Sequence, residues 1–97
     1  MKTGIELIAE ERQRQISEEG YTEQHDSQHD LIEFIKASIA YLVASCDEND
    51  SKRFAYGYAW WPWDMLGWKP EDIERNLIKS GALIVAAIDK LQKEKIC

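Results

Sequence analysis

Apolar residues recur at helical spacing in three segments of this chain, and the alternation typical of β-strands is almost absent. The three segments cover about residues 5–17, 27–46 and 69–94. Residues three and four positions apart share one face of a helix, so each segment predicts an amphipathic α-helix. The sequence therefore predicts an all-α fold, a small bundle of three main helices.

Local signals mark the ends of these helices. Thr3 and Glu6 have the spacing of a capping box, and Gly20 ends the first segment. Pro70, followed by Glu71 and Asp72, suits the first turn of the third helix. The apolar stripes expected to face the core are Ile5, Ile8, Ala9, Arg12 and Ile16, then Leu31, Ile35, Ser38, Ile39, Leu42 and Cys46, then Ile73, Leu77, Ile84, Ile88 and Leu91.

Length and charge limit the class of protein. With 97 residues, the chain is expected to form one domain over 1–97. A net charge of −6 argues against binding to duplex nucleic acid, although a bound metal ion can invert the local charge. The chain has no apolar run of ~18 residues and no basic start followed by apolar residues. These features predict a cytoplasmic protein that does not enter a membrane.

The connection between the second and third helices is long and aromatic, and it contains all four tryptophans. A connection of about 20 residues in so small a domain is usually functional or disordered, and its aromatic content argues against disorder. Trp63 or Trp68 would offer a flat face on which a nucleobase can stack. Alternatively, the tryptophans complete a small core or bury a contact between subunits.

The second helix carries a second face opposite Ile35. Glu33 lies there with Ala37, Ala40 and Ala44, a row of small residues that allows another helix to approach closely. This helix is therefore expected to be packed on both sides, so that oligomerisation completes the bundle. Glu33 would then be partly buried, where an unpaired carboxylate is costly and requires a cation or a proton.

A metal ion is one way to neutralise Glu33. Asp26, His29 or Asp30, and Glu33 follow one another at helical spacing, and hard ions such as Mg²⁺ prefer oxygen ligands. Glu74 on the third helix is a possible further ligand. The alternative is that the aspartates favour the positive end of the helix dipole, while Glu33 pairs with Lys36 or an arginine.

Basic side chains supply candidates for binding an anion. Arg12 falls on the apolar stripe of the first helix, where its guanidinium requires a carboxylate or a phosphate. Arg75 and Lys79 are expected to point outward from the third helix, toward a phosphate group. Asn76 flanks the core face of the same helix.

Several short stretches, spread in order over nearly the whole chain, resemble one family. They are Glu11-Arg12-Gln13-Arg14-Gln15, Glu19-Gly20-Tyr21-Thr22, His25-Asp26 with His29, Trp61-Pro62-Trp63-Asp64, Trp68-Lys69-Pro70, and residues 75–84. The chain is similar in these stretches to the MazZ-type dATP/dGTP diphosphohydrolases of phages and prophages. That family is related to the MazG-like all-α nucleotide pyrophosphohydrolases.

The resemblance implies a helical bundle that forms a dimer or tetramer and holds Mg²⁺ between carboxylates of two helices. It also implies hydrolysis of a deoxynucleoside triphosphate to the monophosphate and pyrophosphate. The broader MazG pattern is Glu-Glu-x-x-Glu on one helix and Glu-x-x-Asp on the next. This chain departs from it, with Asp30-x-x-Glu33 and Glu71-x-x-Glu74.

Residues and resemblance together give a working assignment. Asp26, Asp30, Glu33 and Glu74 would hold the metal; Glu33, Asp30 and Lys79 would act in catalysis; Arg12, Arg14, His29, Trp63, Trp68, Arg75 and Asn76 would bind the nucleoside triphosphate. The rival hypothesis is a non-catalytic helical interaction or oligomerisation module of phage or prophage origin. The shortness of the chain and its incomplete acidic motifs favour the rival.

Overall fold

The computed structural model describes residues 1–19, 30–46 and 49–96, and all regular structure in these residues is helical. The all-α expectation is confirmed. The elements are α1 (Gly4–Ser17), α3 (Leu31–Ala44), α4 (Asp50–Tyr58), the 3₁₀ helix η1 (Met65–Gly67) and α5 (Ile73–Ile96). None of the helices in these ranges combines the length and apolar character needed to cross a bilayer.

Hydrogen bonds between side chains and backbone amides fix where the helices begin. The predicted capping box of α1 is present: the Glu6 amide donates to Thr3 Oγ1 at 3.3 Å, and the Thr3 amide donates to Glu6 Oε1 at 3.0 Å. The third helix begins at Ile73 rather than at residue 69, because Asp72 Oδ1 accepts the Arg75 amide at 2.8 Å and so caps that end.

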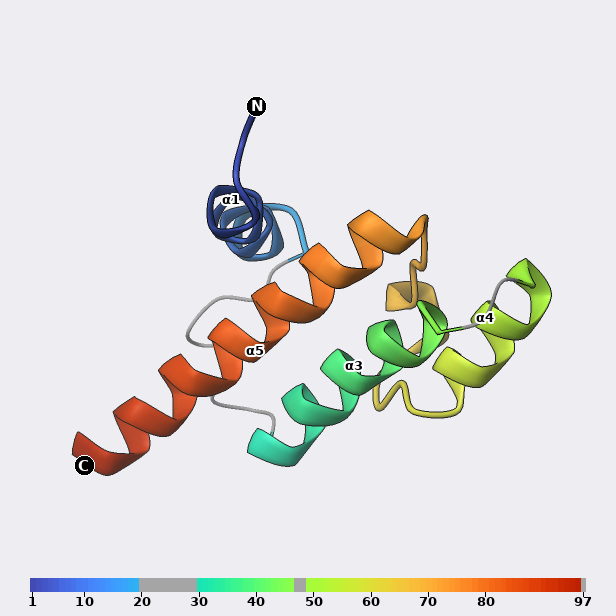
Figure 1. The fold of residues 1–97 in the computed structure, drawn as a ribbon. Helices are drawn as coiled ribbons and strands as arrows, with labels where there is room; N and C mark the ends of the chain where they lie inside the picture. Colours follow the sequence, from blue (N-terminus) through green and yellow to red (C-terminus); the bar gives the residue numbers. More distant parts are fainter. Residues whose placement is uncertain (20–29, 47–48, 97) are drawn as a thin grey trace.

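α5 lies at the centre of the arrangement. It packs along α3 in the most extensive helix contact and also packs against α1, while α4 packs against α3. Figure 1 shows α3 and α5 side by side in opposite directions, with α1 crossing the first half of α5 steeply. The Ser38 and Ser80 hydroxyls lie 2.9 Å apart where α3 meets α5.

The core contains other faces of α3 and α5 than the aliphatic stripes that were expected there, although Ser38 of the expected α3 stripe is buried. Ala37, Ala40 and Ala44 are completely buried, whereas Ile35 and Leu42 are 44% and 40% exposed. The stripe of α5 expected in the core, from Ile73 to Leu91, is likewise exposed, and Ile78, Ala82, Leu83, Ala86 and Ala87 are buried instead. The prediction that the aliphatic stripes face the core was therefore wrong, whereas the row of small residues on the second helix is packed as expected.

Aromatic side chains explain this choice of face. Trp61 and Trp68 are buried beside Tyr41, with ring centroids 5.6 Å and 4.8 Å from it, and the Phe34 ring is completely buried against Trp63 at 5.2 Å. These large rings fill the interior, so the helices behind them need small residues there to approach closely. The aliphatic stripes are left outside.

The aromatic connection is more regular than expected. Its first part forms α4, with Asn49 Oδ1 accepting the Lys52 amide at 3.1 Å as the cap, and η1 follows. Trp61 Nε1 donates to the Asp64 carbonyl at 2.9 Å, and Trp68 Nε1 donates to the Phe54 carbonyl at 3.2 Å. The connection is thus a folded part of the core, and the three-helix description was too simple.

We expect Gly57→Ala to lower the free energy of unfolding by about 1–3 kcal/mol through overpacking. A methyl group there would lie 2.5 Å from the Trp68 ring and 2.8 Å from the Ala40 carbonyl oxygen. Gly4→Ala is the matched control, since nothing lies within 4 Å of that position. Urea unfolding followed by circular dichroism measures both variants. A Gly57→Ala protein as stable as wild type would show that this contact is not tight.

Candidate functional site: an ion-pair cluster around Glu11

A buried carboxylate on α1 organises the charged side chains of this protein. Glu11 is 2% exposed and forms a two-pronged ion pair with Arg14, whose Nε and Nη2 donate to its two oxygens at 2.8 Å and 2.7 Å. Arg75 from α5 donates through Nη2 to Oε1 at 2.6 Å, and Gln15 donates to Oε2 at 3.4 Å. The carboxylate therefore ties α1 to the first turn of α5.

The charges of this cluster are mutually stabilising. Burial by itself raises the pKa of Glu11, but hydrogen bonds and positive charges from Arg14 and Arg75 outweigh burial and hold that pKa below its ordinary value of 4.5. The hydrogen bond to Glu11 in turn raises the pKa of Arg14, despite the partial burial of the guanidinium. Glu11 is therefore ionised at neutral pH and acts as a fixed negative charge between two guanidinium groups.

A second acid extends the cluster toward the aromatic connection. Glu19 accepts Arg14 Nη1 at 3.1 Å and Lys69 Nζ at 2.9 Å. Burial raises the pKa of Glu19, and the hydrogen bonds from Lys69 and Arg14 more than reverse this, so the pKa is lowered. Glu19 thus links the end of α1 to the segment that leads into α5.

Two buried polar residues of α5 hold that leading segment in place. Lys79, 4% exposed, donates to the Lys69 carbonyl at 2.5 Å and pairs with Glu71, while its Nζ lies 5.6 Å from the Tyr41 ring centroid. Asn76 is completely buried and exchanges two hydrogen bonds with the backbone of Glu71, at 2.7 Å and 3.1 Å. The expectation that Lys79 points outward was wrong, because its ammonium is needed to satisfy a carbonyl group inside.

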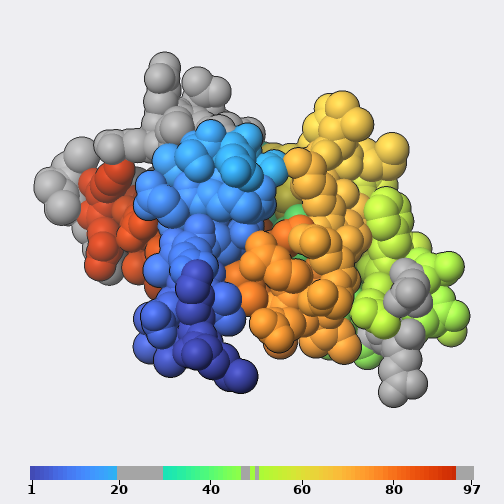
Figure 2. Space-filling model, turned by 90° about the horizontal axis from the view of Figure 1, so that it is seen from above, coloured from blue at the N-terminus to red at the C-terminus, as the bar shows by residue number. Residues whose placement is uncertain are grey.

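These side chains surround a small polar hollow. It is lined by residues of α1, α3 and α5 and by the connection, among them Glu11, Gln15, Tyr41, Trp61, Lys69 and Lys79. In Figure 2, α1 in blue and the segment leading into α5 in orange lie on the two sides of this region. Gln15 is 3% exposed, and its Oε1 accepts no hydrogen bond within the described part of the chain. A buried acceptor of this kind has room here for about one donor molecule the size of water.

The predicted metal ligands are not gathered at this cluster. Asp30 and Glu33 lie at the start of α3, where Glu33 Oε2 accepts the Asp30 amide at 2.8 Å. Asp26 and His29 lie outside the described residues. Among the residues that the structure describes, no group of three or more His, Cys, Asp or Glu side chains is arranged to hold a metal ion. The hydrogen bond between Glu33 and the Asp30 amide is the one expected of a residue that caps the start of a helix.

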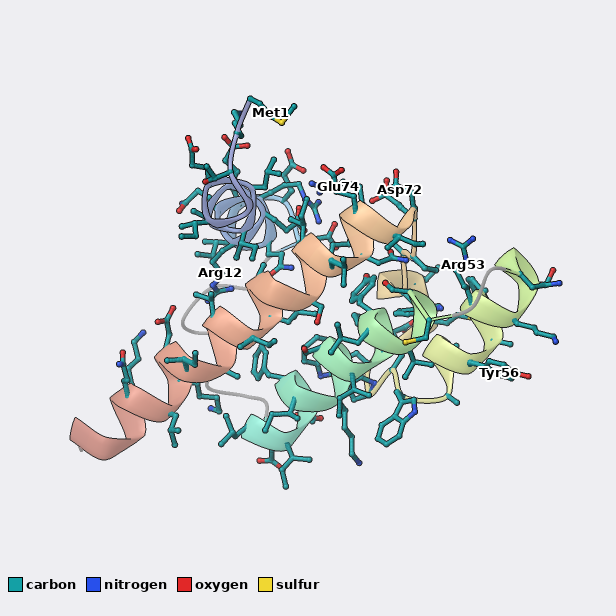
Figure 3. The ribbon with its side chains drawn as sticks, in the orientation of Figure 1. Met1, Arg12, Arg53, Tyr56, Asp72 and Glu74 are labelled. Atoms are coloured by element: carbon teal, nitrogen blue, oxygen red, sulfur yellow. The ribbon has the colours of Figure 1, made fainter. Side chains whose placement is uncertain are left out.

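Glu74 lies far from Glu33 in a single chain. α3 and α5 run in opposite directions, so the start of α5 is beside the end of α3. Figure 3 shows Glu74 with Asp72 at this end, away from the start of α3. The structure therefore does not place Glu74 with Asp30 and Glu33 in one chain.

The predicted nucleotide-binding residues divide into two groups. In the first group, Arg14 and Lys79 line the hollow, Arg75 shares Glu11 with Arg14, and Asn76 holds the backbone of Glu71. Arg12 on α1 is half-buried. In Figure 3 it lies beside a part of α5 that is nearer the C-terminus than Glu74. The two tryptophans also differ, as Trp68 is 4% exposed within the core, whereas Trp63 is half-buried at its edge and offers more of its ring to a ligand.

Sequence reasoning missed Glu11, Gln15 and Lys69. A signal for the first two was present, because Ile8, Glu11 and Gln15 follow at helical spacing on one face of α1. Ile8 contacts Gly81 on α5, so that face is the one that packs. Two polar residues on a packing face indicate a buried polar network. Lys69 carried no comparable signal, since its role depends on how the connection folds.

The fold and the cluster together define a small all-helical protein with a buried, charged centre beside a tryptophan-rich segment. Comparison of the chain with protein-family models, with curated proteins and with solved structures gives no match.

Proposed function

We propose that this chain is a magnesium-dependent nucleoside triphosphate pyrophosphohydrolase, acting on dATP or dGTP to give the monophosphate and pyrophosphate. The observation that carries the proposal is the gathering of Arg14, Arg75 and Lys69 around two carboxylates, Glu11 and Glu19. Guanidinium groups bind phosphate through paired N–H groups, and a lysine adds a mobile positive charge. The sequence resemblance supplies the reaction.

Arg75 retains capacity for a ligand, whereas Arg14 already donates to Glu11, Glu18 and Glu19. The two side chains are 32% (Arg14) and 34% (Arg75) exposed, although each is anchored to the buried Glu11. Within the described residues, the side chain of Arg75 donates to Glu11 through Nη2 and has further N–H groups available. Glu11 would therefore orient guanidinium groups in advance, which lowers the entropy lost when a phosphate binds.

Lys79 would act through the backbone rather than on the phosphate. It holds the Lys69 carbonyl and pairs with Glu71, while Asn76 holds the same short segment. This arrangement would fix the backbone of Lys69, whose side chain lines the hollow. We therefore assign Lys79 and Asn76 to positioning.

Asp30 and Glu33 would hold the magnesium ion, with Asp26 and His29 as further candidates. Mg²⁺ is commonly bound by one or two carboxylates, with phosphate oxygens and water completing its shell, so two acids at the start of α3 fit the ion. When bound, the ion supplies charge neutralisation and an activated water molecule. Glu33 and Tyr41 are eight residues apart on α3, roughly 12 Å along its axis. A nucleoside triphosphate is long enough to extend over such a distance.

Thermal melting with Mg²⁺ and a non-hydrolysable dGTP analogue tests the binding that the proposal requires. A ligand at 100 times its Kd stabilises the folded state by about 2.7 kcal/mol, which raises Tm by roughly 13 °C for a domain of this size. We expect this rise with both components and a much smaller one with deoxyguanosine. An unchanged Tm at millimolar analogue and Mg²⁺ would contradict the proposal.

A non-catalytic interaction module is the second candidate. The observation that favours it is the set of aliphatic side chains that α3 and α5 leave at the surface, including Ile84 and Ile88 at 44% and 49% exposed. Such a module would show no change of Tm with Mg²⁺ and the analogue, so the same melting experiment separates the two functions.

A further inference from the structure

Buried side chains from four parts of the chain line the polar hollow. Glu11 and Gln15 belong to α1, Tyr41 to α3, Lys79 to α5 and Trp61 to the aromatic connection, and all five are buried. A molecule the size of water can place its centre within a volume of about 10 Å³ in this hollow, which is room for one such molecule. The chemistry of the lining then decides which molecule fits.

The orientation of the Gln15 side-chain amide is fixed by its neighbour. Its Nε2 donates to Glu11 Oε2 at 3.4 Å, and an ionised carboxylate can only accept hydrogen bonds. Arg14 and Arg75 both donate to Glu11 and keep it ionised. The amide therefore cannot turn around and present its oxygen to Glu11. Gln15 Oε1 is held on the other side of the amide, as a buried acceptor.

This buried acceptor requires a hydrogen-bond donor. Gln15 is 3% exposed, and no group in residues 1–19, 30–46 and 49–96 donates to its Oε1. Leaving a buried acceptor without a donor is costly, so proteins nearly always satisfy such groups, by ordered water where no protein group reaches them. Because Gln15 lines the hollow, a molecule held there can supply the donor.

Lys79 offers the complementary group. An ammonium has three N–H groups, and two partners of Lys79 are the Lys69 carbonyl and the Glu71 carboxylate. The third N–H can donate to a further acceptor, and Lys79 lines the same hollow as Gln15. A molecule that both donates and accepts hydrogen bonds would therefore satisfy the two side chains together.

The charges of the lining favour a neutral molecule. The lining contains two carboxylates and three cations, which are Glu11, Glu19, Arg14, Lys69 and Lys79. A metal ion would lie close to three positive groups, whereas an anion would lie close to two carboxylates and an amide oxygen. Water carries no charge, and it offers both donors and acceptors.

We propose that the hollow is a binding site for a single water molecule, which donates to Gln15 Oε1 and accepts from Lys79 Nζ. The water links α1 to α5 beside the ion pair between Glu11 and Arg75. A phosphate group is larger than the hollow, so this site is separate from the one proposed for the nucleotide. The inference does not depend on the proposed hydrolase activity.

A high-resolution crystal structure of the full wild-type chain tests the site directly. We expect an ordered water molecule within about 3.2 Å of both Gln15 Oε1 and Lys79 Nζ.

Magnetic relaxation dispersion of the water oxygen tests the same site in solution, because it counts the long-lived internal water molecules of a protein. A chain of 97 residues commonly holds about three or four of them, so the informative quantity is the difference between variants. Gln15→Met keeps the length of the side chain and removes the acceptor, and we expect it to hold one long-lived water fewer than wild type. Gln13→Met is the matched control, because Gln13 is exposed on the same helix, and it is expected to keep the wild-type number.

Two results would overturn the proposal. One is a wild-type crystal structure in which the space beside Gln15 Oε1 is empty, or holds an ion or a protein donor in place of water. The other is an equal number of long-lived waters in wild type and in a Gln15→Met protein that circular dichroism shows to be folded. The crystal structure needs no variant, so it decides the question even where Gln15→Met does not fold.

Discussion

Glu11→Ala is expected to lower the free energy of unfolding by about 3–5 kcal/mol, the loss typical of breaking a buried ion pair on one side. The substitution leaves Arg14 and Arg75 without their shared carboxylate, and it removes the link between α1 and α5. A domain of this size has a total stability of about 5–15 kcal/mol, so the variant will be close to unfolding at room temperature. Urea unfolding at neutral pH measures the effect.

The neighbouring residue gives the control. Glu10 pairs with Lys2 at the surface, with both side chains more than half exposed, and Glu10→Ala is expected to change stability by less than about 1 kcal/mol. If Glu11→Ala were as mild as Glu10→Ala, the buried cluster would not hold α1 on α5.

The same carboxylate leaves a signature in the pH dependence of stability. The pKa of Glu11 is lowered in the folded state, so its contribution is complete above the ordinary value of 4.5 and is lost as pH falls through the lower, folded value. The unfolding free energy of wild type therefore decreases in acid. Glu11→Gln should show a shallower decrease, with the remaining slope due in part to Glu19, whose pKa is lowered as well.

Glu33→Gln is expected to reduce the rate of pyrophosphate release by at least about 100-fold, because removing a carboxylate ligand weakens both metal binding and the chemistry that the metal supports. Glutamine can still accept the Asp30 amide, since it is an accepted third residue of a capping box, so the fold is expected to persist. The measurement is the initial rate of pyrophosphate release from dGTP in saturating Mg²⁺.

Glu74→Gln is the matched control for this variant. Both glutamates were candidate metal ligands, but the structure places Glu74 at the opposite end of the α3–α5 pair. We expect Glu74→Gln to retain most of the activity. Equal rates for Glu33→Gln and wild type would remove Glu33 from the mechanism, and a selective loss in Glu74→Gln would require a site that draws on a second copy.

The helices could be predicted from sequence, but their inward faces could not. Periodicity shows that the second helix has an aliphatic side at Ile35 and a small-residue side at Ala37 and Ala40, and it does not say which side meets the core. That choice depends on the volume brought by Trp61 and Trp68 from the connection. Such a contact between distant segments leaves no periodic signal in either one.

The charged site could also be predicted only in part, because its members come from segments that are distant in the sequence. Arg14, Arg75 and Lys79 were predicted to act on a phosphate, and the structure brings Arg14 and Arg75 together at one carboxylate. The anion itself, Glu11, lies beside the exposed Glu10, and the sequence of that pair does not show which carboxylate turns inward. Burial was decided by the packing of Ile8 on Gly81, which positions one face of α1 against α5.

The most direct test of the proposed function is the product analysis of dGTP and dATP incubated with the purified chain. With Mg²⁺, the proposal predicts equal amounts of pyrophosphate and deoxynucleoside monophosphate, and it predicts that excess EDTA abolishes both. A folded protein that yields neither product from either nucleotide in Mg²⁺ would contradict it.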